Sequence, residues 1–326
     1  MRREIDEIPD AVARLASPAS QERLRAVARR LKELDPGVVL TVGRGSSDHA
    51  ATYLKYAIEI ALGRPVASIG PSIATVYGAK LHVSGLVALA VSQSGGSGDL
   101  VTLAQSLTRG GCAVVAVTNS ARSPLAESAT HVVDVAAGPE RAVAATKSFV
   151  NSVVAGLWIV AFWSGDHDLE AALQSLPETL RHGGEEPVGD EVLTALGKTE
   201  RAVVIGRGPG LGIAQETALK LIETCGIHAS AYSAAEVLHG PNAILKSGYP
   251  VLALATAESG LDQAIERLSR QGAQVTVIGR AGRPMHRLVD PLLPLPALYR
   301  AVEQVSRARG LSPDAPSFLT KETSTL

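Results

Sequence analysis

The chain has 326 residues, which is enough for one large or two ordinary domains, and 46% of them are hydrophobic. That apolar content supports a sizeable core and excludes an intrinsically disordered chain. The net charge of −1 argues against a nucleic-acid binder and against a basic protein of the membrane surface.

The N-terminus and the longest apolar run bear on where the protein works. Residues 1–10 are charged and carry no signal-peptide pattern. The longest apolar run, 152–163, is too short to span a bilayer and fits a buried helix. We therefore expect a soluble cytoplasmic protein with no membrane partner and no nucleic-acid partner.

Strand-like and helix-like segments alternate along the first half of the chain. An N-terminal helical stretch, 8–34, is expected to break at Pro18. Glycines end the later helices, as Gly63 does after 48–62. The other predicted segments are strands at 38–42, 66–69, 86–91, 113–118 and 132–135, and a helix at 99–108. This alternation predicts an α/β fold with a parallel, doubly wound sheet.

The second half of the chain repeats the first. Val42-Gly43-Arg44-Gly45 returns 163 positions later as Ile205-Gly206-Arg207-Gly208, and Gly63 returns as Gly226 at the same offset. Such self-similarity predicts two copies of one α/β unit. We expect an N-terminal helical segment (1–35), a first unit (36–165), a helix and linker (166–198), a second unit (199–296) and a C-terminal helix and tail loop (297–326).

A serine-rich loop, 92–97, follows one of the predicted strands and precedes a helix. Its hydroxyls, the Gln93 amide and the backbone of Gly95-Gly96 are hydrogen-bond donors, and a helix N-terminus favours an anion. The loop contains no lysine or arginine, so it predicts a neutral cradle, that is, a set of uncharged hydrogen-bond donors that binds a phosphate monoester. Ser46 and Ser47 would close this cradle from the other side. The alternative interpretation is an ordinary polar loop between a strand and a helix. The equivalent residues of the second copy, 255–259, resemble such a loop more closely, because they have lost most of the hydroxyl groups.

A second candidate site lies on the predicted helix 213–225. Glu216, Lys220 and Glu223 are spaced to share one helix face, and a His239-Gly240-Pro241 turn follows. The opposite face, which would meet the core, carries Ala218, Leu221, Ile222 and Cys225. The alternative interpretation is a solvated stripe with one Glu–Lys pair.

These motifs together resemble the double sugar-isomerase (SIS) proteins. The resemblance is carried by residues 43–47, 92–95, 138–140, 144–147, 216–223 and 239–241, and by a tail with Arg309-Gly310-Leu311, Asp314, Pro316 and Lys321. It covers the chain from about residue 36, with the motifs in family order. Within the family, the motifs are most similar to the isomerase half of glucosamine-6-phosphate synthase and to SIS-type glucosamine-6-phosphate deaminases. The resemblance implies two tandem SIS units, each a flavodoxin-like three-layer α/β/α sandwich.

The resemblance also implies which residues bind the substrate. It assigns phosphate binding to the two serine turns, and sugar contacts to Val143 and Ala145. Ala145 departs from the synthase, which has a serine there, so that contact would be made through the backbone alone. The residues of the two turns are Gly45, Ser46, Ser47, Ser92, Gln93, Ser94 and Ser97.

Four catalytic roles follow from the same resemblance. Glu223 would move a proton between C1 and C2, and Lys220 would lie near that acid. His239 would open the sugar ring and complete the site of a neighbouring subunit, which implies a homodimer. Lys321 would lie near the reactive carbon, where an amine can pair with sugar oxygens or form an imine. Independently of the family, a carboxylate suits this transfer, and a histidine suits proton exchange with a ring oxygen.

No metal and no cofactor are expected. The eight histidines are scattered, and Cys112 and Cys225 lack metal-ligand spacing, so both cysteines are expected to be buried free thiols.

Several related reactions on sugar phosphates are compatible with these motifs. Only a short helical segment precedes the first unit, with no glutaminase, so we expect glucosamine 6-phosphate to be deaminated to fructose 6-phosphate and ammonia rather than synthesised. The alternatives are a related isomerase or deaminase, a fructosamine-6-phosphate deglycase, and a non-catalytic sugar-phosphate regulator.

Overall fold

The protein is described by a computed structural model that covers residues 1–183, 190–256, 260–279 and 284–321. The chain divides into two compact units. The N-unit consists of Asp10–Glu140, Lys147–Gln174 and Thr320–Leu326, and the C-unit of Met1–Pro9, Arg141–Thr146 and Ser175–Leu319. Parts of the expected linker (184–189), of the second-copy loop (257–259) and of the tail (322–326) lie outside the described residues.

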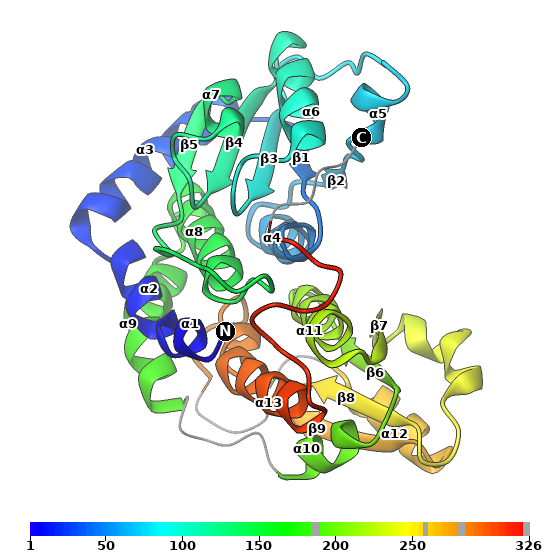
Figure 1. Cartoon of the computed structure of the whole chain (residues 1–326). Coiled ribbons are helices and arrows are strands. Elements are labelled where there is room, and N and C mark those ends of the chain that lie inside the picture. The colour runs from blue at the N-terminus through cyan, green and yellow to red at the C-terminus, as the bar shows by residue number, and fades with distance from the viewer. Residues whose placement is uncertain (184–189, 257–259, 280–283, 322–326) are drawn as a thin grey trace. The chain divides into compact units, whose positions relative to one another are not determined.

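The N-unit is built on a five-stranded parallel sheet in the order β2-β1-β3-β4-β5 (Figure 1). The register pairs Leu40 with Ala88 and Ala88 with Val114. This strand order is the flavodoxin-like one, so the predicted doubly wound parallel sheet is confirmed. The strands are β1 (Val39–Val42), β2 (Val66–Ser68), β3 (Val87–Ser92), β4 (Ala113–Thr118) and β5 (His131–Asp134).

Helices cover both faces of this sheet because its strands are apolar on both sides. On one face, Leu40, Ala88 and Val114 pack against Leu103 of α6 (Gly98–Arg109) in one buried cluster. The helices α3 (Pro18–Leu34) and α4 (Ser46–Leu62) pack on α8 (Lys147–Ser164). The break expected at Pro18 is confirmed: the preceding helix ends at Leu15, and Pro18 begins α3, where a proline is tolerated in the first helical turn. Shorter helices complete the unit: α2 (Ile8–Leu15), α5 (Ser72–Thr75) and α7 (Pro124–Ser128).

The apolar helix α8 is a core element. It is long and apolar enough to cross a membrane, but 89% of its apolar window is buried inside the protein. The sequence-based interpretation of residues 152–163 as a buried helix is confirmed. Within its own unit, α3 and α4 pack on the helix.

The C-unit carries a four-stranded parallel sheet in the order β7-β6-β8-β9. Its strands are β6 (Arg201–Gly206), β7 (His228–Ser233), β8 (Pro250–Leu254) and β9 (Gln274–Ile278). Against one face, α12 (Asp262–Arg270) packs Ala264 and Leu268 on Val251 and Ala253. The helix α11 (Gly210–Cys225) packs on β6 and β7, and α13 (Leu295–Ala308) packs on α11. Smaller elements are α1 (Arg2–Asp6), α10 (Asp190–Gly197), η1 (Glu236–Leu238), η2 (Pro241–Ile244) and η3 (Asp290–Leu292), and α9 (His167–Gly183) joins the two units along the chain.

The two sheets are copies of one another, as the 163-residue offset predicts. The order 2-1-3-4 of the first sheet returns as β7-β6-β8-β9 in the second. Gly63 and Gly226 end equivalent helices with φ of 64° and 63°, a left-handed conformation that glycine adopts without strain.

Candidate functional site

The predicted site residues are divided between the two units. The C-unit holds Val143, Ala145, Lys220, Glu223 and His239. The N-unit holds the two serine turns and Lys321, that is Gly45, Ser46, Ser47, Ser92, Gln93, Ser94, Ser97 and Lys321.

The serine loop follows β3 and leads into α6, as the sequence predicts. The Ser92 hydroxyl accepts a hydrogen bond from the Gly95 N–H at 3.1 Å, and the Ser94 hydroxyl accepts one from the Gly96 N–H at 3.2 Å. Both hydroxyl groups stay able to donate their own hydrogen to a ligand. Ser92 is buried, whereas Ser94 and Ser97 are half-buried and within reach of a ligand.

Gly95 holds the shape of this loop. Its φ is +63°, and a Cβ added there would lie 2.0 Å from the Ser123 hydroxyl oxygen. The Gly95 carbonyl accepts a hydrogen bond from Leu125 N–H at 3.0 Å, and the Gln93 carbonyl accepts one from Asn119 N–H at 3.2 Å. The neighbouring loop after β4 thus keeps the serine loop in one conformation.

An ion pair links the two serine turns, and sequence reasoning missed it. Arg44, in the turn after β1, contacts the Asp99 Oδ2 atom through Nη2 at 3.0 Å and Nε at 3.1 Å. Asp99 is buried in the first turn of α6, two residues after Ser97. The predicted neutral cradle therefore has a pair of opposite charges beside it. The signal was present in the sequence, because Arg44 belongs to the 43–47 turn itself. Burial raises the pKa of the nearby Asp48 carboxyl, and the His49 and Arg44 charges partly offset that effect.

In the C-unit, α11 carries a buried charged cluster. The side chains of Glu216 and Lys220 are 0% and 1% exposed, and that of Glu223 is 23% exposed. The Lys220 amine contacts the Glu223 carboxylate and lies 3.6 Å from Glu216 Oε1. Tyr299 of α13 donates a hydrogen bond to the same Glu216 oxygen at 3.1 Å.

This burial overturns the solvated-stripe interpretation of the helix. Burying charges is unfavourable unless they are paired and hydrogen-bonded, so the cluster carries a cost that a solvated face would not. The assignment of Ile222 to the core face is also wrong, since it is 49% exposed. Of the charged face, Glu216 contacts α13 through the Tyr299 hydroxyl.

His239 lies at the end of the 3₁₀ turn η1 and is exposed. Its backbone N–H bonds to the Glu236 carbonyl at 3.0 Å, which holds the turn and presents the ring to the outside.

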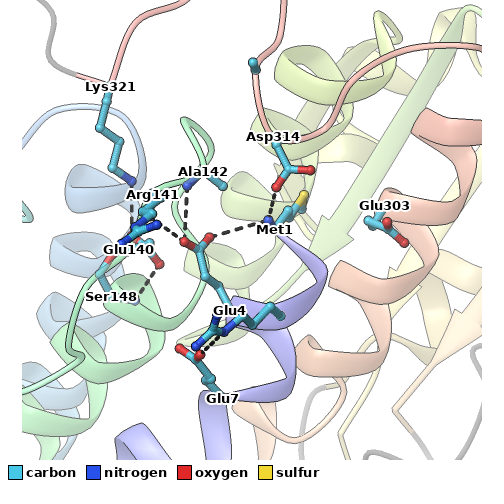
Figure 2. A network of polar contacts seen from close by, with 12 residues as sticks. Met1, Glu4, Glu7, Glu140, Arg141, Ala142, Ser148, Glu303, Asp314 and Lys321 are labelled. Atoms are coloured by element: carbon cyan, nitrogen blue, oxygen red, sulfur yellow. Dashed lines mark hydrogen bonds and ion pairs between the residues drawn. The ribbon is translucent and has the colours of Figure 1, made fainter.

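Lys321 contacts a residue to which the sequence assigned no role. Figure 2 shows its amine pointing at the carboxylate of Glu140, with Nζ 3.4 Å from Oε2. Glu140 belongs to the 138–140 motif, yet nothing in that motif marks it as a partner of a tail lysine 181 residues away.

Val143 lies on a segment that is held at several points within the C-unit. The Glu4 carboxylate accepts hydrogen bonds from the backbone N–H groups of Arg141 and of Ala142, the latter at 3.2 Å (Figure 2). The Val143 N–H donates to the Asp314 carbonyl at 3.1 Å. The Met1 amine in turn contacts the Asp314 carboxylate, as Figure 2 shows. Sequence reasoning missed the part that Glu4 plays.

Neither cysteine forms a disulfide within the described residues. Cys112 and Cys225 are buried free thiols, as predicted, and burial raises the pKa of Cys112 to about 11. Burial also raises the pKa of Cys225, with a smaller opposing effect of the Thr224 hydroxyl. Across the described ranges, no group of three or more His, Cys, Asp and Glu side chains is placed to hold a metal ion.

Comparisons with known proteins identify the family. The SIS domain family matches residues 35–161 and 195–290. A Pyrobaculum aerophilum protein named glutamine–fructose-6-phosphate aminotransferase (isomerizing) is 31% identical over 98% of this chain and 56% of its own length. The chain belongs to the SIS domain family, which confirms the resemblance seen in the sequence. It spans about half the length of the curated relatives that it matches.

Two solved structures share the fold. A Silicibacter pomeroyi DSS-3 protein, provisionally named a phosphosugar isomerase, has a TM-score of 0.90 and 45% identity, covering 96% of this chain and 99% of that one. Thermotoga maritima glucosamine-6-phosphate deaminase has a TM-score of 0.72 and 22% identity, covering 93% and 99%. At that identity the second likeness concerns the fold alone.

Proposed function

We propose that the protein is an amino-sugar-phosphate deaminase that converts glucosamine 6-phosphate and water into fructose 6-phosphate and ammonia. The observation that carries the proposal is the buried cluster of Glu216, Lys220 and Glu223. A protein that only binds sugar phosphates has no need to bury an amine between two carboxylates. Clusters of partly desolvated acids and amines are typical of sites that move protons.

Glu223 is the proton carrier in this proposal. Its carboxylate is the most exposed member of the cluster, and it contacts the Lys220 amine. Once the sugar is an open-chain aldehyde, Glu223 removes the proton from C2 and returns it to C1. The C2–H bond breaks and a C1–H bond forms, a proton passes from the amine nitrogen to the aldehyde oxygen so that C1 becomes an alcohol, and the amino-bearing C2 becomes an imine. Water then hydrolyses this C=N bond, which leaves the ketone of fructose 6-phosphate and releases ammonia.

The serine turns of the N-unit are proposed to bind the 6-phosphate. The serine hydroxyl groups and the N-terminus of α6 favour a dianion there. Val143 and Ala145 are proposed to contact the sugar, and Lys321 to act near its reactive carbon.

The proposal is tested by measuring ammonia release across a panel of hexosamine and fructosamine 6-phosphates. We expect release from glucosamine 6-phosphate. The Glu223→Gln variant should lose a factor of about 10²–10⁴ in kcat while it still binds the sugar phosphate. Glu200→Gln is the matched control, because Glu200 is an exposed carboxylate of the same unit, and it should leave kcat unchanged.

The other outcomes distinguish the alternatives. Conversion of a different 6-phosphate in the panel would favour a related isomerase or deaminase, or a fructosamine-6-phosphate deglycase. Binding without release or interconversion of any sugar would refute the enzyme and favour a sugar-phosphate regulator. The cytoplasmic location remains a prediction from the sequence.

We further propose that the protein acts as a homodimer in which His239 serves the partner's site. The exposed position of His239 on a 3₁₀ turn supports this, since the ring is presented away from its own core. Mixing inactive Glu223→Gln with inactive His239→Ala under subunit exchange should restore part of the activity, because one mixed site then contains both intact residues. A fully active monomer in light scattering would refute the dimer.

A further inference from the structure

We propose that Glu140 is the positioning residue of the tail lysine Lys321, and that their ion pair fixes where the Lys321 amine meets the sugar. This inference rests on the proposed function for its chemical consequence, but the ion pair itself is tested without any assay of activity.

The burial of Glu140 is the first step of the argument. Its side chain is 0% exposed, so its charge must be compensated inside the protein. The Ser148 N–H donates to Glu140 Oε1 at 3.1 Å, and the Ser148 hydroxyl donates to Oε2. Lys321 supplies the positive charge at 3.4 Å from the same Oε2.

The two partners differ in how firmly they are held. Ser148 lies in the first turn of α8, a core helix of 18 residues whose N-terminus also favours a nearby carboxylate. Lys321 lies on a tail that has no helix or strand between residues 310 and 321. Ser148 therefore fixes the position of the Glu140 carboxylate, and Glu140 in turn fixes the position of the Lys321 amine.

The exposure of Lys321 shows why such an anchor matters. Its side chain is 26% exposed, so a ligand can reach the amine while Glu140 holds it. A long, flexible lysine on an irregular tail otherwise samples many positions, and a misplaced catalytic group loses much of its effect. Glu140 acts through Lys321 and is not itself assigned a contact with the substrate.

The first test is tryptic cleavage of the peptide bond after Lys321, followed by mass spectrometry. Trypsin must take the Lys321 amine into its own specificity pocket, so the cleavage rate reports the fraction of protein in which the amine has left Glu140. Glu140→Gln keeps the shape but removes the charge, and should raise this rate about threefold or more. Glu170→Gln removes the Arg25 ion pair of the same unit and should leave the rate unchanged. An unchanged rate in Glu140→Gln overturns the proposal.

A measurement on the unaltered protein covers the case in which Glu140→Gln does not fold. Acetylation of lysine amines should be slower at Lys321 than at Lys80, which is exposed in the same unit. Equal rates at the two lysines would overturn the proposal.

The second test is a double-mutant cycle on kcat. If Glu140 acts through Lys321, then Glu140→Gln lowers kcat in the native background but has no further effect in a Lys321→Ala background. A purely structural role would lower kcat by the same factor in both backgrounds, and that result overturns the proposal. If the protein proves to release no ammonia, the deaminase proposal fails, while the cleavage and acetylation tests still decide whether Glu140 holds the tail.

Discussion

Replacing Lys220 by methionine tests whether the charged cluster of α11 is the buried network that the structure describes. Methionine matches lysine in length and in helix propensity, so the substitution removes the charge and little else. It leaves the Glu216 carboxylate fully buried, with the Tyr299 hydroxyl at 3.1 Å and no amine at 3.6 Å.

The expected effect is large. Breaking a buried ion pair by removing one partner costs about 3–5 kcal/mol, because the remaining charge is left uncompensated. For a unit of this size that corresponds to a decrease in Tm of about 6–20 °C. Glu216→Gln in the Lys220→Met background removes the buried Glu216 charge while an amide oxygen still accepts from Tyr299. The double variant should recover about 2 kcal/mol of the loss.

The assay must resolve the C-unit from the N-unit. Both tryptophans, Trp158 and Trp163, lie in α8 of the N-unit, so tryptophan fluorescence does not report the unit that contains Lys220. Hydrogen exchange with mass spectrometry does, and peptides of α11 should lose protection more than peptides of α8. Lys198→Met, an exposed lysine in the C-unit, is the control and should change the stability by less than about 0.5 kcal/mol. A loss below about 1 kcal/mol in Lys220→Met would refute the buried network, since that is the value of an exposed pair.

Three further predictions concern the N-unit. Gly95→Ala should unfold the serine loop and abolish substrate binding, because the new Cβ would lie 2.0 Å from the Ser123 hydroxyl oxygen, whereas Gly98→Ala has open space and should bind normally in calorimetry. Ser94→Ala should raise KM for the 6-phosphate about 10–150-fold, the equivalent of one hydrogen bond to a charged group, and equal turnover of glucosamine and its 6-phosphate by the native protein would contradict this. Burial raises the pKa of Cys112 from 9.0 to about 11, so its contribution to stability is present below pH 9 and is lost as the pH rises from about 9 to about 11. Iodoacetamide should therefore label Cys112 slowly at pH 8 in the folded protein and quickly in urea, and equal rates would contradict its burial.

Local pattern alone was sufficient to predict much of the architecture. Strand-length apolar runs that alternate with glycine-terminated helices predict a parallel doubly wound sheet, because such runs must be covered on both faces. The repeat of Val42–Gly45 at Ile205–Gly208 predicted the second sheet, since similar segments fold into similar units. Element ends shifted by a few residues, as for the helix expected at 48–62 and found at Ser46–Leu62.

The spacing of Glu216, Lys220 and Glu223 determined that they share a helix face, but it could not determine whether that face is exposed to solvent or buried. Helical periodicity is a property of the segment itself, whereas burial depends on what packs against it. Tyr299, 83 residues from Glu216, supplies a hydrogen-bond partner for the buried Glu216 carboxylate, whereas Ile222 is exposed.

Contacts between distant segments were decided by the tertiary structure alone. Nothing near Glu140 in the sequence points to Lys321, because the two meet only after the tail folds back onto the N-terminus of α8. Arg44 and Asp99 are likewise joined only once β1 and β3 lie side by side in the sheet. The sequence by itself therefore determined the family and the repeat, and it supplied the residues that are proposed to carry the chemistry. The tertiary structure decided which charges are buried and which partners hold them, because burial and pairing arise between segments that no local pattern connects.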